Sequence, residues 1–403
     1  FKQKTAYEIQ FGDWSSDVAL PIFSVALLVA TASGGWSQRP SLTWLGTLSD
    51  GHSAALGISV DGSTVVGWYE AAAWRSRPFR WTREEGMRDL GTLGGPSGWA
   101  VGVSANGTVV VGWATNASFY FRAFRWTAAD GMQDLGTLGG LTSRATDVSA
   151  DGSVIVGMAD NSLGSPRAFR WTASEGMRDL GTLGGNLSWA SGVSADGTVV
   201  VGGSYNQDWQ RRAFRWHPRE GIREIGALVA NGESAATDVS ADGSVVVGWA
   251  VNAAGYGRAF RWTPDDGMQE LGALPLFDSS EATAVSADGT AVVGFAYNAN
   301  REYRAVRWTQ ATGMQDLNAI YASLLTAGSR LEQANAISPD GRYIAGVGWN
   351  AEARRLEGFL LDTIPEPTSV LALCAGLTGL LLQRRWQRSR RRFREAPSPT
   401  TRR

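Results

Sequence analysis

The chain has 403 residues and a formal net charge of −1, but nine Arg and one Glu from Arg384 onward give the C-terminal end +8 and leave −9 for the rest. An acidic body argues against nucleic acid as a partner, since phosphate binding requires a basic surface. The single cysteine, Cys374, excludes an internal disulfide framework and any zinc site built from several cysteines.

Residues 1–35 are predicted to be an N-terminal export signal. An apolar run over 18–30 is followed by small residues at 31–35, which is the order of the hydrophobic region and cleavage zone of a secretory signal peptide. A buried strand of the adjoining repeat array is the alternative, but the run shares no residue pattern with that array. We therefore expect the protein to be exported.

Residues 42–362 form one array of seven repeats. A two-residue turn, Asp-Gly or once Asn-Gly, recurs at steps of 45, 45, 45, 46, 46 and 52 residues. The turns begin at Asp61, Asn106, Asp151, Asp196, Asp242, Asp288 and Asp340. Self-similarity at such a period is typical of repeat architectures, so the array is one domain rather than several.

Each repeat is predicted to contain four short strands, which we call a, b, c and d. In the third copy they cover residues 145–149, 153–159, 167–172 and 177–183, and Gly-containing turns join a to b and c to d. Strand b is almost continuously apolar, as expected for a strand buried on both faces. Four strands in one repeat of this length indicate one blade of a β-propeller.

The strands at the two ends of the array predict a closed ring. The array begins with a lone strand d at 43–48 and ends with a copy that has strands a, b and c at 334–338, 343–347 and 357–361 but no d. The first strand can therefore complete the last blade and remove the free edges. The predicted fold is an all-β, seven-bladed β-propeller with its N-terminal strand closing the last blade; an open β-solenoid is the alternative.

The repeat resembles two groups of known proteins. Residues 338–345 read Ser-Pro-Asp-Gly-Arg-Tyr-Ile-Ala, which resembles the blade motif of TolB-type propellers. The whole array is similar to the HAF family of probable extracellular repeat proteins, named for His-Ala-Phe. This chain has Arg-Ala-Phe instead, starting at Arg122, Arg167, Arg212 and Arg258. The resemblance implies an extracellular repeat protein and assigns no activity.

The repeated charged residues are interpreted as structural. The central Arg of each Phe-Arg-Trp triplet, such as Arg125, is expected to pair across strands c and d with an acid such as Asp134. The Asp of each Asp-Gly turn is expected to stabilise the turn, because calcium would need several converging oxygen ligands. A nucleic-acid platform and a calcium or sialidase-type site are the disfavoured alternatives.

Few residues suggest catalysis. The chain has only two His, His52 and His217, at non-equivalent positions, so we expect no His-based metal site, no Ser-His relay and no cofactor. Carboxylate pairs remain open for glycosidic chemistry, although no acid stands out from the repeat pattern as a site. Five irregular acids are assigned to solvated loops: Asp208, Asp278, Glu281, Glu302 and Glu352.

Variation between copies is concentrated in the b–c and d–a loops. Strand direction alternates, so these loops lie together on one face of the ring, here called the loop face, while the a–b and c–d turns lie on the opposite turn face. Variable loops on a rigid scaffold commonly carry function, so their aromatic residues are the candidate ligand-binding residues. They are Trp74, Trp99, Phe119, Tyr120, Trp189, Trp209, Tyr256 and Tyr303.

The expected function is an exported surface or extracellular-matrix module that binds a polysaccharide or a protein through the loop face. A carbohydrate-active enzyme, a lyase or hydrolase with carboxylates at the channel mouth, is the first alternative. Two carboxylates close together in a pocket would favour it. A structural surface protein without a specific ligand is the second alternative.

The C-terminal end, residues 364–394, has the order of a sorting segment, and 395–403 is expected to be a disordered tail. Pro365, Glu366 and Pro367 precede an apolar run that starts at Thr368 and ends at Leu382, followed by clustered Arg. This order resembles a PEP-CTERM signal, which implies an exosortase-type membrane protease of a Gram-negative bacterium as a partner. The run is predicted to be a short apolar helix that anchors the chain transiently in the inner membrane; a simple C-terminal anchor is the alternative.

Overall fold

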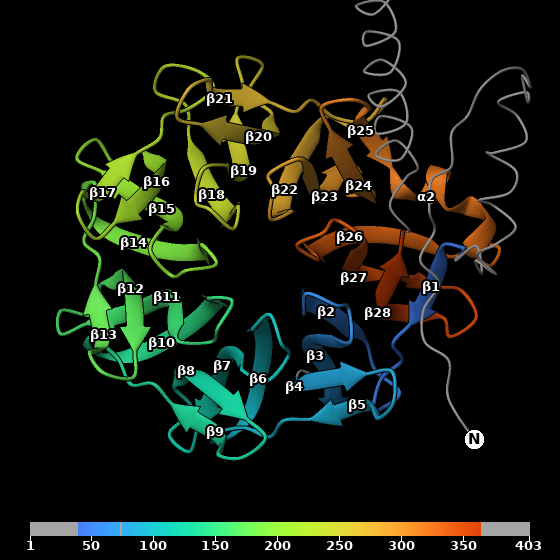
Figure 1. The fold of residues 1–403 in the computed structure, drawn as a ribbon, viewed down its shortest axis with the longest axis horizontal. Coiled ribbons are helices and arrows are strands. Elements are labelled where there is room, and N and C mark those ends of the chain that lie inside the picture. Colours follow the sequence, from blue (N-terminus) through green and yellow to red (C-terminus); the bar gives the residue numbers. More distant parts are fainter. Residues whose placement is uncertain (1–38, 73–74, 364–403) are drawn as a thin grey trace, which may run out of the picture. The chain divides into compact units, whose positions relative to one another are not determined.

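The computed structural model describes residues 39–72 and 75–363. The predicted export signal, the sorting segment with its apolar helix, and Trp74 lie outside these residues. The described chain forms seven antiparallel sheets of four strands each, arranged as the blades of a β-propeller (Figure 1). The predicted all-β, seven-bladed fold is therefore confirmed.

Every blade has the predicted strand order a-b-c-d. The a strands are β2 (Ser53–Ile58), β6 (Gly94–Val103), β10 (Gly139–Val148), β14 (Gly184–Val193), β18 (Ser234–Val239), β22 (Ser279–Val285) and β26 (Arg330–Ile337). The b strands are β3 (Thr64–Ala72), β7 (Val110–Asn116), β11 (Val154–Asn161), β15 (Val200–Asn206), β19 (Val246–Val251), β23 (Ala291–Tyr297) and β27 (Tyr343–Asn350).

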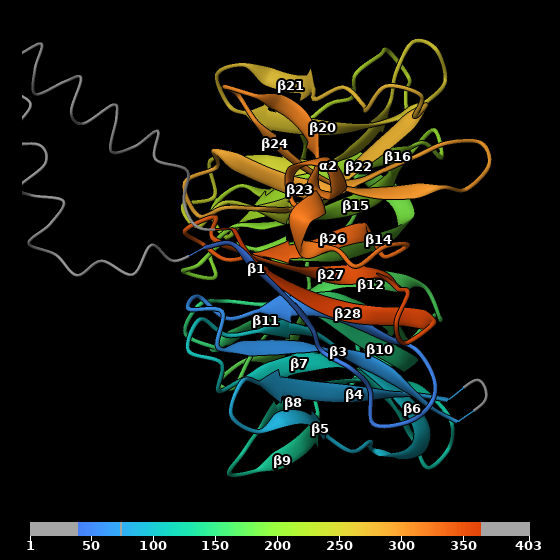
Figure 2. The same cartoon turned by 90° about the vertical axis from the view of Figure 1, so that its right-hand side faces the viewer.

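Strands c and d hold the two outer positions of each blade. The c strands are β4 (Arg75–Thr82), β8 (Phe121–Thr127), β12 (Pro166–Thr172), β16 (Arg211–His217), β20 (Gly257–Thr263), β24 (Tyr303–Thr309) and β28 (Arg355–Asp362). The d strands are β5 (Gly86–Asp89), β9 (Gly131–Asp134), β13 (Gly176–Asp179), β17 (Gly221–Glu224), β21 (Gly267–Glu270), β25 (Gly313–Asp316) and β1 (Ser41–Trp44). Figure 2 shows the blades from the side, with their strands running between the two faces.

The d strands end earlier than predicted. In the third blade β13 stops at Asp179, whereas strand d was predicted to reach residue 183. The Asp179 side chain accepts a hydrogen bond from the backbone N–H of Gly181 at 2.7 Å, and Gly181 has φ of +84°. A left-handed glycine held by a side-chain cap turns the chain away from the sheet, so the strand cannot continue.

The N-terminal strand closes the ring as predicted. β1 pairs with β28 in antiparallel register, from Ser41 opposite Asp362 to Trp44 opposite Phe359. The backbone N–H of Leu45 adds a hydrogen bond to the carbonyl of Gly358 at 2.8 Å. The last blade is thus built from both ends of the array, and β1 covers the outer edge of β28.

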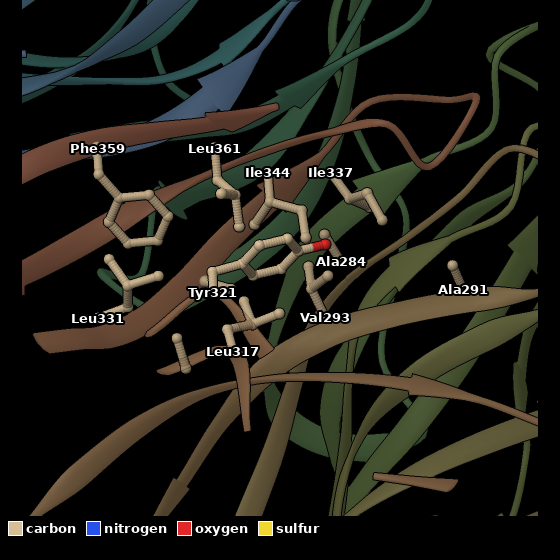
Figure 3. Packing of buried hydrophobic residues seen from close by; sticks show 12 residues of the cluster. Ala284, Ala291, Val293, Leu317, Tyr321, Leu331, Ile337, Ile344, Phe359 and Leu361 are labelled. Carbon is tan, nitrogen blue, oxygen red and sulfur yellow. The ribbon is translucent and has the colours of Figure 1, made fainter. Parts of the chain in front are cut away.

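The long last step of 52 residues reflects an insertion that the sequence did not reveal. A one-turn helix, α2 (Leu317–Ile320), and the 3-10 turn η1 (Ala322–Leu324) lie between β25 and β26. Leu317 is fully buried, and Tyr321 packs with it in a cluster that includes Leu331 and Phe359 (Figure 3). The insertion therefore fills the junction between the sixth and seventh blades.

Strand b and the Phe of strand c supply a large part of the core. The predicted burial of strand b on both faces is confirmed, because Val65 and Val66 of β3 are both fully buried. The Phe of strand c is also fully buried in six blades: Phe79, Phe124, Phe169, Phe214, Phe260 and Phe359. Such continuous burial fixes the blades as a rigid scaffold for the loops.

The predicted pairing of the central Arg with the strand d acid is wrong. Asp134 lies directly opposite Phe124, so it shares a face with Arg122, two residues before Phe124, and not with Arg125. Arg122 accordingly forms the ion pair with Asp134 at 3.6 Å. The same exchange of partner occurs in Arg77–Asp89, Arg212–Glu224, Arg258–Glu270 and Arg304–Asp316.

Candidate functional site

A β-bulge interrupts strand a of every blade at the same position. In β10 the register shifts between Ala145 and Asp147, which leaves Thr146 as the extra residue. The residues equivalent to Thr146 are Leu56, Val101, Ser191, Thr237, Thr283 and Asn335. A bulge redirects side chains from the sheet, and here it directs them to the centre of the ring.

The bulged residues line a central channel and join neighbouring blades. A cavity of about 360 Å³ is lined by strand a residues of all seven blades. The Thr146 hydroxyl donates to the carbonyl of Ala190 in the next blade at 3.0 Å, and Asn335 connects the last blade to the Ala55 carbonyl of the first at 2.8 Å. Strand a thus supplies both the channel wall and the contacts between blades.

The turn-face end of the channel is encircled by a series of backbone hydrogen bonds between neighbouring blades. The N–H of Val60 donates to the carbonyl of Ala105 at 3.1 Å, and equivalent bonds continue from blade to blade until Ala287 donates to Pro339 at 2.9 Å. Pro339 has no N–H, so it cannot donate the seventh bond back to the first blade. The series of hydrogen bonds is therefore interrupted between the last blade and the first, where β1 joins the two ends of the array by pairing with β28.

Two carboxylates face this channel. Asp147 and Asp238 occupy the position after the bulge, where the other blades have Gly57, Gly102, Gly192, Ala284 and Ala336. Both oxygens of Asp147 accept backbone hydrogen bonds, from Val148 at 2.8 Å and from Val193 of the next blade at 2.9 Å. The corresponding donors to Asp238 are Val239 and Val285, at 2.7 and 2.9 Å.

Removal from water raises the pKa of both channel carboxyl groups. The pKa of Asp147 rises to about 8, mainly through burial and further through the negative charge of Asp238. Burial likewise raises the pKa of Asp238 to about 7. The expectation that no acid stands out from the repeat is therefore wrong: two acids replace small residues in the channel.

Glu281 also differs from its prediction. It was assigned to a solvated loop, but it lies within strand β22 and is only partly exposed. Burial raises its pKa to about 7, and the positive charge of Arg211 acts in the opposite direction. Glu281 is thus a third acid held partly away from water.

The Asp of the Asp-Gly turns stabilises the turn, as predicted. Asp61 accepts hydrogen bonds from the Ser59 hydroxyl at 2.8 Å and from the Ser63 backbone N–H at 3.0 Å. These hydrogen bonds, led by that of the Ser63 backbone, hold the pKa of Asp61 below its ordinary value. Asn106 makes the same contacts with Ser104 and Thr108.

The candidate aromatic residues divide into exposed and packed groups. Four side chains are well exposed, with exposed fractions of 72% for Phe119, 40% for Tyr120, 65% for Trp209 and 43% for Tyr256. The packed ones are Trp189, which meets Tyr205 edge to face at 6.4 Å, and Tyr303, which stacks on Tyr297 at 5.8 Å, together with Trp99. The structure therefore does not unite the seven candidate residues that it describes in one site.

The exposed aromatics stand on b–c loops with a shared backbone frame. In each frame an Asn carboxamide oxygen accepts N–H groups of the loop, as Asn116 does from Ser118 and Tyr120, both at 3.0 Å. The residue three places after that Asn donates back to its carbonyl and has a positive φ. In successive blades this residue is Phe119, Gly164, Trp209, Gly255 and Arg301.

Sequence reasoning missed an aromatic stack that spans two blades. Trp99 stacks on Trp68 of the first blade at 5.3 Å and lies against Trp113 at 5.2 Å, and Trp113 meets Phe121 edge to face at 4.9 Å. The Trp99 indole N–H donates to the Ser76 hydroxyl at 2.6 Å. We call Trp68, Trp99, Trp113 and Phe121 the aromatic platform; each keeps part of its surface exposed.

Arginine side chains stack on loop-face aromatic rings in several blades. The guanidinium carbon of Arg144 lies 4.5 Å from the ring centre of Phe121 and 5.3 Å from that of Trp113. Arg211 lies 4.2 Å from the ring centre of Trp249 in the same manner. Arg211 also pairs with Glu233 at 2.8 Å. Arginine and aromatic surface are therefore combined on this face.

Neither a metal cluster nor a membrane span is found among the residues described. Over 39–72 and 75–363, no three His, Cys, Asp or Glu side chains gather closely enough to hold a metal ion. No helix within the same part of the chain is long and apolar enough to cross a bilayer.

Comparisons with known proteins identify the fold and no family. No protein-family model and no curated protein matches the chain. An oligogalacturonate lyase in complex with manganese is similar in structure, with a TM-score of 0.51 and 12% sequence identity. The match covers 81% of this chain and 93% of that chain. A putative TolB from Agrobacterium tumefaciens is also similar, with a TM-score of 0.46 and 14% sequence identity. That match covers 74% of this chain and 97% of that chain. At these identities the similarity shows the propeller fold alone.

Proposed function

We propose that this protein is an exported β-propeller that binds a polysaccharide through its loop face. The observation that carries the proposal is the positive-φ position of the b–c loops. Two blades place Gly164 and Gly255 there, the residue that a positive φ favours, whereas two others place the exposed side chains of Phe119 and Trp209. A bulky residue in left-handed conformation costs about 1 kcal/mol or more, so its retention favours a functional role.

The loops are suited to a rigid ligand such as a sugar ring. The Asn residues of these loops are used by the fold, because their side chains hold the loop backbone, as Asn206 does for Asp208 and Gln210, both at 3.0 Å. The aromatic side chains are thus presented on an ordered frame, which lowers the entropy lost on binding. Flat aromatic surface beside polar backbone can stack on sugar rings.

The proposal is tested by screening the full chain against a glycan array. Trp209→Ala and Tyr256→Ala are expected to lose at least about tenfold in affinity for the glycan that binds, which corresponds to about 1.4 kcal/mol. Leu163→Ala is the matched control, because Leu163 is 86% exposed on the equivalent loop of the third blade but is not aromatic. Equal loss in all three variants, or no glycan bound at all, would contradict the proposal. Binding of a protein partner or a purely structural role would then gain support.

Export and sorting are part of the same proposal. The signal-like residues 1–35 and the Pro365-Glu366-Pro367 motif with its apolar run and Arg cluster support delivery to the cell surface or matrix through an exosortase-type protease. Mass spectrometry of the exported protein tests this step. A chain that ends near Pro367 is expected, whereas an intact Arg-rich C-terminus would mean a retained anchor.

An enzyme that cleaves a polysaccharide is the second candidate, and one observation favours it. Asp147 and Asp238 line the same channel cavity, and burial gives them a raised pKa, which suits a carboxyl group that donates a proton near neutral pH. Release of new reducing ends or unsaturated products from a bound polymer would support this candidate. It requires that Asp147→Gly abolish the release while polymer binding persists.

A further inference from the structure

Arg144 differs from the other arginines that stack on aromatic rings in the described part of the chain. In the described residues five arginines stack on aromatic rings, and four of them have a carboxylate partner within 4.0 Å: Arg211, Arg258, Arg304 and Arg342. Within residues 39–72 and 75–363, Arg144 has neither an ion pair nor a hydrogen bond to a side chain, and it only stacks on Trp113 and Phe121. Its guanidinium donors are therefore available to a ligand.

The surroundings of Arg144 make an unpaired charge costly. The side chain is only partly exposed, and burial lowers the pKa of its guanidinium, although the negative charge of Asp160 acts in the opposite direction. Asp160 itself is engaged, because its Oδ2 accepts the Thr142 hydroxyl at 2.7 Å and the Thr142 N–H at 3.2 Å. A partly buried cation without a bonded carboxylate would be stabilised by an anionic group from outside.

The aromatic platform beside Arg144 supplies the second half of a subsite. Trp68, Trp99 and Trp113 form a continuous row of indoles across two blades, and Arg144 extends it to a third. Phe119 and Tyr120, both well exposed, directly precede Phe121 of the platform in sequence. Apolar ring surface next to a planar cation matches a sugar ring that bears a carboxylate.

We propose that Arg144 and the aromatic platform form a subsite for one uronic acid residue of the polysaccharide bound on the loop face. This inference rests on the proposed polysaccharide-binding function. In the subsite the guanidinium of Arg144 binds the carboxylate by two parallel hydrogen bonds, and the indoles contact the sugar ring. The fork of N–H donors on Arg can bind both oxygens of a planar carboxylate at once.

Equilibrium binding of the full chain to three polymers tests the subsite: polygalacturonate, dextran sulfate and unmodified dextran. Polygalacturonate is expected to bind most tightly. Arg144→Gln should weaken that binding by about tenfold or more, as expected for loss of a charged hydrogen bond, while leaving any dextran binding unchanged. Arg144→Lys should restore only part of the loss, because Lys lacks the bidentate fork.

Arg178→Gln is the matched control, since Arg178 is an exposed residue of the outer strand β13 and its replacement removes the same charge. It should leave the affinity for polygalacturonate unchanged. The subsite is refuted if Arg144→Gln and Arg178→Gln lose affinity for polygalacturonate equally. It is also refuted if dextran sulfate binds as tightly as polygalacturonate and loses as much affinity in Arg144→Gln. A third refuting result is tighter binding of dextran than of either charged polymer. Absence of binding to every polysaccharide refutes the proposed function instead, so the two failures are distinguishable. Melting curves of each variant exclude unfolding as the cause of a loss.

Discussion

The turn face and the loop face use the same repeat in opposite ways. On the turn face the copies repeat both backbone and side-chain contacts: a buried Ser, an Asp or Asn acceptor and, in six of the seven copies, a backbone bond to the next blade, as at Ser149, Asp151 and Ala150. On the loop face the backbone frame and the Asn that holds it recur, whereas the side chain at the positive-φ position varies from Gly164 to Trp209. Repetition therefore marks what every blade needs to fold, whereas variation within a repeated frame marks the surface available for recognition.

The largest effect is expected on the turn face, for Ser149→Ala. The Ser149 hydroxyl is fully buried, accepts the N–H of Val154 at 2.9 Å and donates to Asp151 at 2.7 Å. Its removal leaves a buried N–H without a partner, which should lower the free energy of unfolding by about 1–3 kcal/mol. Chemical denaturation measures the change. The matched variant Ser153→Ala removes an exposed hydroxyl that bonds the same Asp151, and a loss as large as that of Ser149→Ala would show that burial is not the cause.

The channel acids Asp147 and Asp238 should make the free energy of unfolding fall as pH rises, whereas the acids of the Asp-Gly turns should make it rise. The pKa of Asp147 is about 8 and that of Asp238 about 7, both above their ordinary value, so the folded state binds more protons than the unfolded state between about pH 4 and 8. Stability should therefore fall as pH rises through this window. The pKa of Asp61 is lowered, so its contribution is present above about pH 4 and is lost as pH falls further.

A double variant, Asp147→Gly with Asp238→Gly, isolates the contribution of the channel carboxyl groups to the pH dependence of stability. Gly is suitable because three other blades already carry it at this position. The double variant should remove most of the fall in stability between about pH 5 and 9, because the two carboxyl groups with raised pKa values are then absent. Thermal unfolding across this pH range measures it, with Asp265→Ala as an exposed-turn control. Parallel curves for the double variant and the unaltered chain would show that these carboxyl groups do not ionise in that range.

The smallest effect on stability is expected on the loop face. Trp209→Gly places the residue favoured by a positive φ into a frame that Gly164 and Gly255 already occupy, so the free energy of unfolding should stay constant or rise by up to about 1 kcal/mol. The reciprocal change, Gly164→Phe, should cost about 1 kcal/mol. Denaturation of both variants tests the pair, and a clear loss of stability in Trp209→Gly would mean that the indole serves the fold.

The fold was predictable because its signals are local and repeat. Each Asp-Gly turn fixes a hairpin, and a lone strand d before the first complete copy reveals how the last blade closes. The end of strand d at Asp179 was not predictable in this way, because it depends on a side-chain cap rather than on apolar alternation. The α2 helix was missed since one turn is too short to show a helical period.

The site was predicted less completely, for two physical reasons. Asp147 and Asp238 were overlooked because the equivalent residue of the other blades is a Gly or Ala, which only has to be small. An acid at such a position is nevertheless a signal of a functional site that the sequence shows. The Arg pairing was assigned to Arg125 instead of Arg122, because a one-residue error in strand register moves every side chain to the other face. Stacking of Trp68 on Trp99 joins two blades and depends on how the blades pack, which no single repeat encodes.

The central claim is that variation within the loop-face frame serves recognition, and a double variant tests it most directly. Phe119→Gly with Trp209→Gly gives these two loops the backbone residue of their neighbours and removes both exposed rings. Binding to the polysaccharide identified by the array, measured by calorimetry beside a melting curve, should fall by more than tenfold with an unchanged or higher melting temperature. Unchanged binding by a fully folded double variant would contradict the claim.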